Sequence, residues 1–444
     1  MTLKIPNLPA ARKTTKNVLD IIKPPPILTV SEWSDNHRRL SAEASSEAGV
    51  WSTSRAEYQR GIMDAISDDA IEAVTIMSCA QVGKTEMLLN LIGYHIEQDP
   101  SPILVVQPTL DMAQTFSKDR LAPMLRDTPV LKGKVKDPRA RDSGNTTLKK
   151  NFPGGHITMC GANSPSSLAS RPIRIVLCDE VDRFPPSAGT EGDPIDLAKK
   201  RAATFHNRKF VMVSTPTVEG TSRISAAFEN TDKREYYVPC ADCGEEQIMK
   251  WSNVHWDKDQ PETAYYACEH CGSVWDDASR YRAVRRGIWR ATNPEVVGRA
   301  GFRLSGLYSP WITLETAVRE FLEAKKLPET LRVWVNTYLG ETWADEAAGD
   351  GVEDFAISSH REDYGDKVPE GVVVLTAGAD CQADRIEIEV VGWGRDEETW
   401  SIDYRTFYGD PNSANVWAEL DEYLAQTWMR EDGVKLAIKG TCID

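Results

Sequence analysis

Residues 71–91 read IEAVTIMSCAQVGKTEMLLNL, which predicts a short strand, a tight loop and a helix. A mostly apolar run at 74–77 supplies the strand, and the helix begins after Gly83. The loop is close to the phosphate-binding pattern G-x-x-x-x-G-K-[ST]. A glycine there lets backbone N–H groups approach a phosphate, and the N-terminus of the helix adds a favourable partial positive charge. We therefore expect residues 78–85 to bind the phosphates of a nucleotide.

Four residues of this loop are predicted to bind the nucleotide: Gln81, Gly83, Lys84 and Thr85. Lys84 reaches the β- and γ-phosphates, and the hydroxyl of Thr85 ligates Mg²⁺. Ser78 stands where the pattern has its first glycine, so the loop departs from the pattern at one position. The alternative interpretation is an ordinary strand–helix turn that contains the sequence GKT.

A second apolar strand ends in two carboxylates. Residues 173–182 read IRIVLCDEVD, so Asp179 and Glu180 directly follow the apolar run. In ATPases with a phosphate-binding loop, one acidic residue at such a strand end holds Mg²⁺ and another residue positions the attacking water. We predict the first role for Asp179, and we predict that Glu180 orients and deprotonates the water. The two stretches together favour an enzyme that hydrolyses ATP.

Two further pairs of residues belong to this hypothesis. A third strand at 210–213 runs into Ser214 and Thr215, whose hydroxyls suit a sensor that couples hydrolysis to movement. Tyr58 and Gln59 precede the phosphate loop, and an aromatic–Gln pair can stack on an adenine and hydrogen-bond to it. An ordinary helix start explains Tyr58 and Gln59 equally well.

The order of the elements predicts the fold class. Continuous apolar strands, such as ILVV at 103–106, alternate with helical patterns, and such strands are typical of a parallel sheet covered on both faces. We predict an α/β fold with the parallel sheet of a P-loop NTPase, of the RecA or helicase type. Arg171, in a polar loop before the acidic pair, is a weaker candidate for stabilising charge, and a structural role is the alternative.

Four of the nine cysteines form two C-x-x-C pairs, namely Cys240, Cys243, Cys268 and Cys271, with 24 residues between the pairs. Four thiolates at this spacing predict a tetrahedral structural zinc site. A glycine follows the second cysteine of each pair, which suits the tight turn that directs N–H groups at sulfur. We expect a zinc-ribbon-like insertion in which the metal stabilises the fold and takes no part in catalysis.

The charge of the chain is unevenly distributed. The net charge is −15, but residues 341–444 hold 25 acidic and 8 basic side chains, which leaves a net of +2 for the first 340 residues. Within these, residues 132–150 carry seven basic and two acidic side chains. This run is either a solvated loop or a contact for the phosphate backbone of a nucleic acid. We expect no membrane association, since no apolar run approaches the length of a transmembrane helix.

The last part of the chain follows the opening order of an RNase H-like fold. Strand patterns at 372–380, 385–393 and 400–405 precede a helical pattern at 415–430. Asp380 ends the first of these strands, where it would hold a catalytic Mg²⁺ for phosphodiester cleavage. The chain stops in a further strand that ends in an acidic residue, so we expect a C-terminally truncated chain.

These patterns predict five segments: an N-terminal arm at 1–50, a P-loop ATPase domain at 51–235, a four-cysteine zinc-ribbon-like segment at 236–280, linker helices at 281–365, and an incomplete RNase H-like nuclease domain at 366–444.

The motifs, taken in order, resemble those of the large terminase subunit of tailed bacteriophages, specifically the lambda-like GpA family. The resemblance covers residues 30–444 and is carried by GANSPSSLASRPIRIVLCDEVDRFP, VSTPT, the C-x-x-C pairs and AGAD. It implies a motor that moves viral double-stranded DNA into the capsid by ATP hydrolysis, and an endonuclease that cuts concatemeric DNA. It also implies that Asp380 matches the first nuclease carboxylate and Asp444 the second.

The expected cofactors are ATP, Mg²⁺ and a structural Zn²⁺. The resemblance implies double-stranded DNA, a small terminase subunit and the capsid portal as partners, a homo-oligomer during packaging, and the cytoplasm of the bacterial host as the location. Two alternatives stay open at this point. One is an SF2-type helicase or translocase without a nuclease, and the other is a prophage remnant that binds DNA without catalysis.

Overall fold

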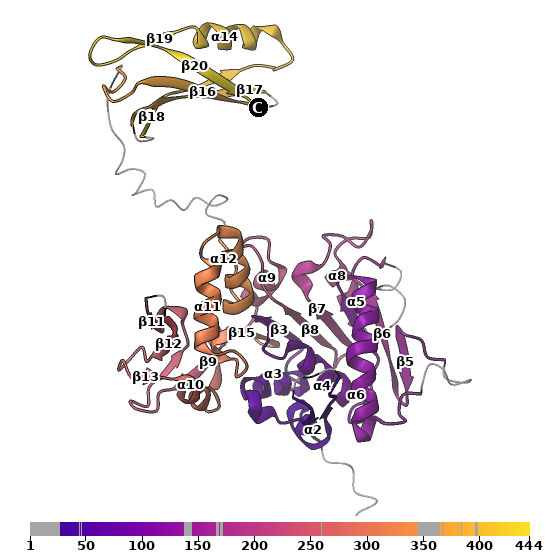
Figure 1. Ribbon diagram of the computed structural model, residues 1–444. Coiled ribbons are helices and arrows are strands. Elements are labelled where there is room, and N and C mark those ends of the chain that lie inside the picture. Colours follow the sequence, from indigo (N-terminus) through magenta and orange to yellow (C-terminus); the bar gives the residue numbers. More distant parts are fainter. Residues whose placement is uncertain are drawn as a thin grey trace, which may run out of the picture. The chain divides into compact units, whose positions relative to one another are not determined.

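The computed structural model describes residues 27–43, 45, 47–136, 144–165, 168, 172–258, 260–344, 365, 367–382, 384–395 and 398–444. The chain forms two compact units, Met1–Ala348 and Gly349–Asp444 (Figure 1). Arg171 and the arginines of the basic run, Arg139 and Arg141, lie outside the described residues.

A sheet of ten strands forms the centre of the first unit, in the order β10-β9-β15-β3-β8-β7-β4-β6-β5, with β14 paired to β9. The parallel strands are β9 (Arg234–Pro239), β15 (Arg299–Leu304), β3 (Ala73–Ser78), β8 (Lys209–Ser214), β7 (Ile175–Asp179), β4 (Ile103–Gln107) and β6 (Gly155–Gly161). Three antiparallel strands complete it: β5 (Lys149–Phe152), β10 (Glu246–Ile248) and β14 (Ile288–Ala291).

Helices cover both faces of this sheet. Successive side chains of a strand point to opposite faces, so one strand contributes residues to two cores. From β3, Val74 and Ile76 pack in one core with helices α3 (Tyr58–Ser67) and α4 (Lys84–Glu97). Met77 of the same strand packs in a second core with α8 (Pro194–Ala202) and α9 (Arg223–Glu229). Every residue of β4, β7 and β8 is buried. The predicted α/β fold with a parallel sheet covered on both faces is therefore confirmed.

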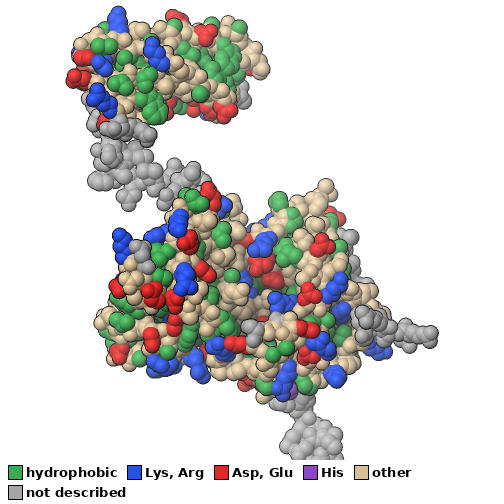
Figure 2. All heavy atoms as spheres, viewed as in Figure 1, with side chains coloured by type: hydrophobic (Ala, Val, Ile, Leu, Met, Phe, Trp, Pro, Cys, Tyr) green, Lys and Arg blue, Asp and Glu red, His purple; other side chains and the backbone are tan. Residues whose placement is uncertain are grey.

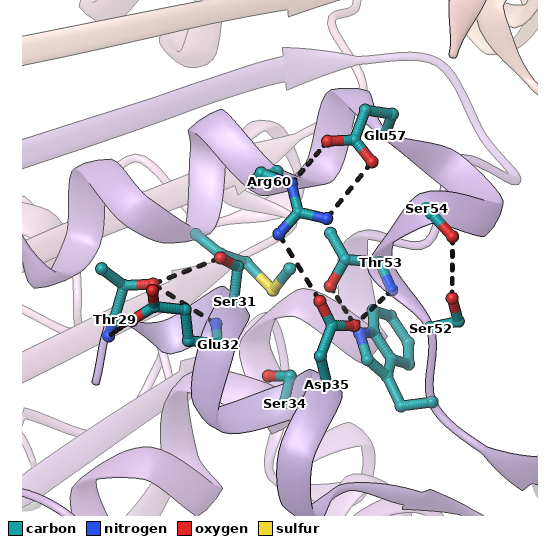
Figure 3. Close-up of polar contacts among 12 residues, drawn as sticks. Thr29, Ser31, Glu32, Ser34, Asp35, Ser52, Thr53, Ser54, Glu57 and Arg60 are labelled. Carbon is teal, nitrogen blue, oxygen red and sulfur yellow. Dashed lines mark hydrogen bonds and ion pairs between the residues drawn. The ribbon is translucent and has the colours of Figure 1, made fainter. Parts of the chain in front are cut away.

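The N-terminal part of the described chain is folded onto this core. Helix α2 (Val30–His37) begins with a capping box between Thr29 and Glu32, and it buries Trp33 completely. Asp35 then joins α2 to the segment before α3, since it accepts from the N–H of Thr53 at 2.6 Å and pairs with Arg60 at 3.5 Å (Figure 3).

The segment that the sequence predicts as linker helices, 281–365, contains β14 and β15, so this expectation was wrong for these residues. Strand β15 lies between β9 and β3, beside the strand that enters the phosphate loop. Its short sequence RAGFRL contains Gly301, where a Cβ would collide with Oγ1 of Thr231. The strand was missed because a short run interrupted by glycine resembles a loop unless its neighbours are known.

The predicted helices of this segment are present as α11 (Leu314–Ala324), α12 (Pro328–Trp334) and the π-helix η7 (Val335–Leu339). They belong to the first unit and pack against the cysteine-bearing segment, where the Trp251 and Trp334 rings are 4.8 Å apart. The first cysteine pair of that segment lies between β9 and β10, and the rest contains a small sheet of β11 (Val254–Asp257), β12 (Gln260–Ala267) and β13 (Val274–Trp275), followed by α10 (Asp277–Val284). The N–H of Ala80 donates to the carbonyl of Thr337 in η7, so these helices also contact the phosphate loop.

Among the described residues, the second unit contains a five-stranded sheet in the order β18-β17-β16-β20-β19, and helix α14 (Ala414–Leu424) lies over one face of it (Figure 1). The strands are β16 (Val374–Cys381), β17 (Arg385–Trp393), β18 (Thr399–Tyr408), β19 (Thr427–Met429) and β20 (Lys435–Ile443). Strands β16, β17 and β18 are antiparallel neighbours, and β20 returns parallel to β16. This is the strand and helix order that the sequence predicts for the opening of an RNase H-like fold.

Candidate active sites

The phosphate loop follows β3 and has the backbone that its sequence requires. Gly83 lies in the left-handed region with φ 84°, directly before α4, and a Cβ there would collide with Nε2 of Gln59. Gln81 also has a positive φ, 58°. Ser78, which replaces the first glycine of the pattern, is the last residue of β3 and has no positive φ. The departure at Ser78 therefore costs the loop nothing in backbone strain.

Three strand ends converge on Lys84. Its Nζ atom lies 2.5 Å from Oγ1 of Thr215, which follows β8, and 3.4 Å from Oε1 of Glu180, which follows β7. The loop after β3 supplies Lys84 itself, and β8 lies between β3 and β7 in the sheet. Ligands of open parallel sheets bind at the carboxyl ends of the strands, where this cluster lies. The structure thus brings together the loop, the acidic pair and the hydroxyl residue that the sequence singled out.

Asp179, the last residue of β7, is a buried carboxylate. Its Oδ2 atom accepts from Nε2 of Gln107 at 3.0 Å. Burial raises the pKa of Asp179 to about 6, since the charged form loses its hydration, and the neighbouring charge of Glu180 acts in the same direction. Oxygen ligands suit Mg²⁺, and a cation would favour the ionised form of Asp179. The carboxylate of Asp179 and the hydroxyl of Thr85, the second residue of α4, therefore fit a Mg²⁺ site.

The pKa of Asp179 makes the stability of the metal-free protein depend on pH. Because its pKa is raised on folding, the folded protein binds the proton of Asp179 more tightly than the unfolded chain does. This proton stabilises the fold fully below about pH 4, and the stabilisation is lost as pH rises through about 6. Asp179→Asn is therefore expected to stabilise the zinc-loaded protein, measured without Mg²⁺, above pH 6 by about 3 kcal/mol, with no gain below pH 4. Urea unfolding at several pH values measures this, and a gain independent of pH would contradict it.

Glu180 has a strained backbone, with φ 55° and ψ 52°. Left-handed conformations of non-glycine residues cost energy and cluster at functional sites. Its second oxygen lies 3.9 Å from Nε of Arg183, so the carboxylate faces one cation on each side. This geometry holds the carboxylate at the end of β7 and beside Lys84.

Two residues that the sequence did not single out organise the site. One is Gln107, at the end of β4, which holds Asp179. The other is Asp182, whose carboxylate accepts from the hydroxyls of Thr217 at 2.8 Å and Ser222 at 2.7 Å. The N–H of Asp182 also donates to Oγ of Ser214 at 3.3 Å. Asp182 thereby joins the loop after the acidic pair to the loop after β8. Its only signal in the sequence was its place in the acidic stretch.

Tyr58 and Gln59 do not present themselves to a nucleotide base. Both side chains are buried, and both donate to the carbonyl of Val82, Tyr58 at 3.3 Å and Gln59 at 2.9 Å. The Tyr58 ring packs edge-on against Tyr236. We conclude that the pair supports the phosphate loop from inside the fold, which agrees with the structural alternative for these residues rather than with adenine stacking.

The four cysteines of the C-x-x-C pairs converge. Their sulfur atoms all lie within 4.8 Å of one another, with 3.8 Å between Cys240 and Cys271 and 3.9 Å between Cys243 and Cys268. A tetrahedron of thiolates about 2.3 Å from zinc has edges of about 3.8 Å. Gly244 and Gly272 have positive φ values of 79° and 72°, as the knuckle turns require. The donor set and its spacing therefore fit Zn²⁺.

In the second unit, register places two predicted carboxylates side by side. Ala379 of β16 pairs with Ile443 of β20, and the N–H of Asp444 donates to the carbonyl of Ala379 at 3.0 Å. Asp380 and Asp444 are thus the next residues of two neighbouring parallel strands. Asp380 accepts from the amide of Gln382. Within the described part of the chain, the four cysteines are the one group of three or more His, Cys, Asp or Glu residues close enough to share a metal ion.

Two of the described lysines of the basic run have partners within the protein. Lys134 pairs with Glu97 at 3.2 Å, and the buried Lys150 donates to the carbonyl of Thr146 at 2.9 Å. Figure 2 shows basic and acidic side chains interspersed over the visible face of the first unit. No helix among the described residues has the length and apolar character needed to cross a membrane.

The first unit thus has the parallel sheet and the phosphate loop of a P-loop ATPase, and the second unit brings two carboxylates together at the ends of neighbouring strands. Two family models match the chain: the ATPase domain of the phage terminase large subunit gpA over residues 45–289, and the terminase large subunit gpA endonuclease domain over residues 299–444. The chain belongs to this gpA family of terminase large subunits. It carries an ATPase domain and an endonuclease domain, and the expected family is confirmed.

Two terminase large subunits are similar over most of the chain. That of Enterobacteria phage P21 is 31% identical in an alignment 459 residues long, which covers 98% of this chain and 71% of that protein. That of Escherichia phage lambda is 31% identical over 441 residues, 94% of this chain and 68% of that protein. Neither the helicase nor the remnant alternative is favoured by these matches.

Solved structures of large terminases are also similar. The HK97 bacteriophage large terminase has a TM-score of 0.44 at 13% identity, over 94% of this chain and 74% of that chain. The ATPase domain of the Thermus phage P74-26 large terminase has a TM-score of 0.39 at 14% identity, over 69% of this chain and 100% of that chain.

Proposed function

We propose that this terminase large subunit moves viral double-stranded DNA into a capsid by hydrolysing ATP at the site around Lys84, and cuts concatemeric DNA with its second unit. The observation that carries the proposal is the convergence of Lys84, Glu180 and Thr215 at the ends of three neighbouring strands. ATP turnover that rises with double-stranded DNA, and is lost in Lys84→Ala, tests the motor half.

Each residue of the ATP site has a role in this account. The N–H groups at the start of α4 and Nζ of Lys84 bind the β- and γ-phosphates. Thr85 and Asp179 would hold Mg²⁺, which would neutralise charge on the phosphates. Glu180 orients the attacking water and takes its proton. Gln81 belongs to the loop that surrounds the phosphates.

To produce movement, ATP hydrolysis must change contacts outside the ATP site. Thr215 contacts Lys84, which binds phosphate in this account, and the neighbouring Ser214 accepts from the N–H of Asp182. Asp182 in turn accepts from the hydroxyl of Thr217, and the carbonyl of Thr217 accepts from the N–H of Trp343 at 2.9 Å. We propose that this series of hydrogen bonds couples hydrolysis to movement of the segment that ends the first unit.

In the second unit, Asp380 and Asp444 would hold the Mg²⁺ for cleavage. Carboxylates on neighbouring strands can share metal ions, which activate water and stabilise the leaving oxygen when they are bound. The expected partners are double-stranded DNA, a small terminase subunit and the capsid portal, with a homo-oligomer forming during packaging. These events take place in the cytoplasm of the bacterial host.

The four cysteines hold a structural Zn²⁺ in this account. Zinc analysis of protein purified without chelators is expected to find about one ion per chain, because the four sulfur atoms are already at tetrahedral spacing. Removal of the ion is expected to lower Tm, since metal binding stabilises the folded segment. Cys381→Ser, at a cysteine of the second unit, is the control and keeps the zinc. A folded protein without zinc would contradict the assignment.

A further inference from the structure

The nucleotide base needs a surface that Tyr58 and Gln59 do not provide. Tyr58 is fully buried, and Gln59 is engaged with the carbonyl of Val82. Stacking requires an aromatic face that solvent reaches, since the base arrives from solvent. A base that stacks at this site therefore needs another aromatic side chain near the phosphate loop.

An exposed indole lies beside the phosphate loop. Trp311 is 40% exposed. Its Cη2 atom lies 3.9 Å from the position that a Cβ would occupy on Gly83, the residue before Lys84. The aromatic ring is therefore next to the loop that binds the phosphates, at the start of α4.

The backbone that carries Trp311 is fixed by buried groups. Arg280 of α10 is fully buried and donates to the carbonyls of Leu307 and Ile312, the latter at 2.6 Å. Ser309 Oγ donates to the carbonyl of Gln81 in the phosphate loop at 3.1 Å. These contacts join the segment around Trp311 to the phosphate loop and to the core.

Two charged side chains hold the indole itself. Its N–H donates to Oε1 of Glu47 at 3.3 Å. Glu47 pairs with Arg55 at 2.8 Å, and the guanidinium carbon of Arg55 lies 5.8 Å from the Trp311 ring centroid. A ring that is already positioned loses less entropy when a ligand stacks on it. Exposure, position and support thus coincide at one aromatic residue.

We propose that Trp311 is the surface on which the base of the bound nucleoside triphosphate stacks. The inference rests on the proposed function, since it adds a residue to the same ATP site. Trp311 lies beyond residues 45–289, which the ATPase model matches, and within the segment matched by the endonuclease model. The structure places it in the first unit, so residues after 289 complete the nucleotide site.

The test compares ligands with and without a base. Trp311→Ala is expected to raise the KM for ATP about tenfold, which corresponds to about 1.4 kcal/mol, and to change kcat less than about twofold. Trp311→Phe keeps an aromatic face and is expected to restore most of the affinity. Binding of inorganic tripolyphosphate, which lacks a base, is expected to be the same in wild type and Trp311→Ala.

Trp393→Ala is the matched control, because Trp393 is 39% exposed and lies in the second unit. An unchanged affinity for ATP in Trp311→Ala would overturn the inference. So would an equal loss of ATP and tripolyphosphate binding, which would show that Trp311 only shapes the loop. Equilibrium binding by calorimetry separates this inference from the proposed function: a base-dependent loss in Trp311→Ala supports the inference even where wild-type turnover is absent.

Discussion

Replacing Glu180 by Gln is expected to abolish ATP hydrolysis while ATP binding stays within a fewfold of wild type. Gln has the same shape but cannot take a proton from water, and removal of a general base costs roughly 10²- to 10⁴-fold in rate. In the proposed account, Lys84 and the start of α4 bind the phosphates, and the substitution leaves both in place. Single-turnover hydrolysis and calorimetric ATP binding, measured on the same sample, check both halves of this expectation.

The exposed Glu191→Gln, in the same unit, is a control that changes the charge equally. If Glu180→Gln lost ATP binding as well as hydrolysis, Glu180 would be a residue that positions Lys84, from which it lies 3.4 Å. Hydrolysis at the wild-type rate would remove Glu180 from the mechanism altogether.

Replacing Asp380 by Asn is expected to abolish Mg²⁺-dependent cutting of double-stranded DNA and to leave ATP turnover unchanged. Asp380 is the residue before the last of β16 and lies beside Asp444, and in the proposed account the loss of one charged oxygen weakens the metal site. The expected loss is at least about a hundredfold, the effect of removing one group that stabilises charge at a reacting centre. The two activities separate because the two sites lie in different units.

Glu419→Gln on α14 is the control for this substitution, because α14 covers the face of the sheet opposite to the one that bears Asp380. Plasmid cleavage with and without Mg²⁺ is the measurement. Cutting by Asp380→Asn at the wild-type rate would place the nuclease metal elsewhere in the unit. A parallel loss of ATP turnover would show that the effect of Asp380 is not local.

The parts of the fold that the sequence predicted are those with continuous local patterns. Strands β3, β7 and β8 are buried on both faces, so their apolar runs were visible without any knowledge of the neighbours. The four cysteines were equally visible, since spacing alone indicates a metal site. Strand β15 was missed because its place in the sheet depends on partners that are distant in the sequence, and one of them, β3, lies more than 200 residues away.

The candidate site was predicted in its charged groups but not in the contacts that position them. Gln107 and Asp182 have ordinary sequence surroundings, and their importance comes from hydrogen bonds to residues on other strands. Tyr58 was a plausible base-binding residue because the sequence does not show burial. Trp311 was not singled out, because its distance from Gly83 exists only in the folded chain.

The most direct test of the central claim is the ATP turnover of this chain, loaded with zinc, as the concentration of double-stranded DNA rises. The account predicts turnover that increases with DNA and disappears in Lys84→Ala, because Nζ of Lys84 is the cation at the meeting point of the three strand ends. Turnover in Lys84→Ala at the wild-type level, or a wild-type rate that does not respond to DNA, would contradict it.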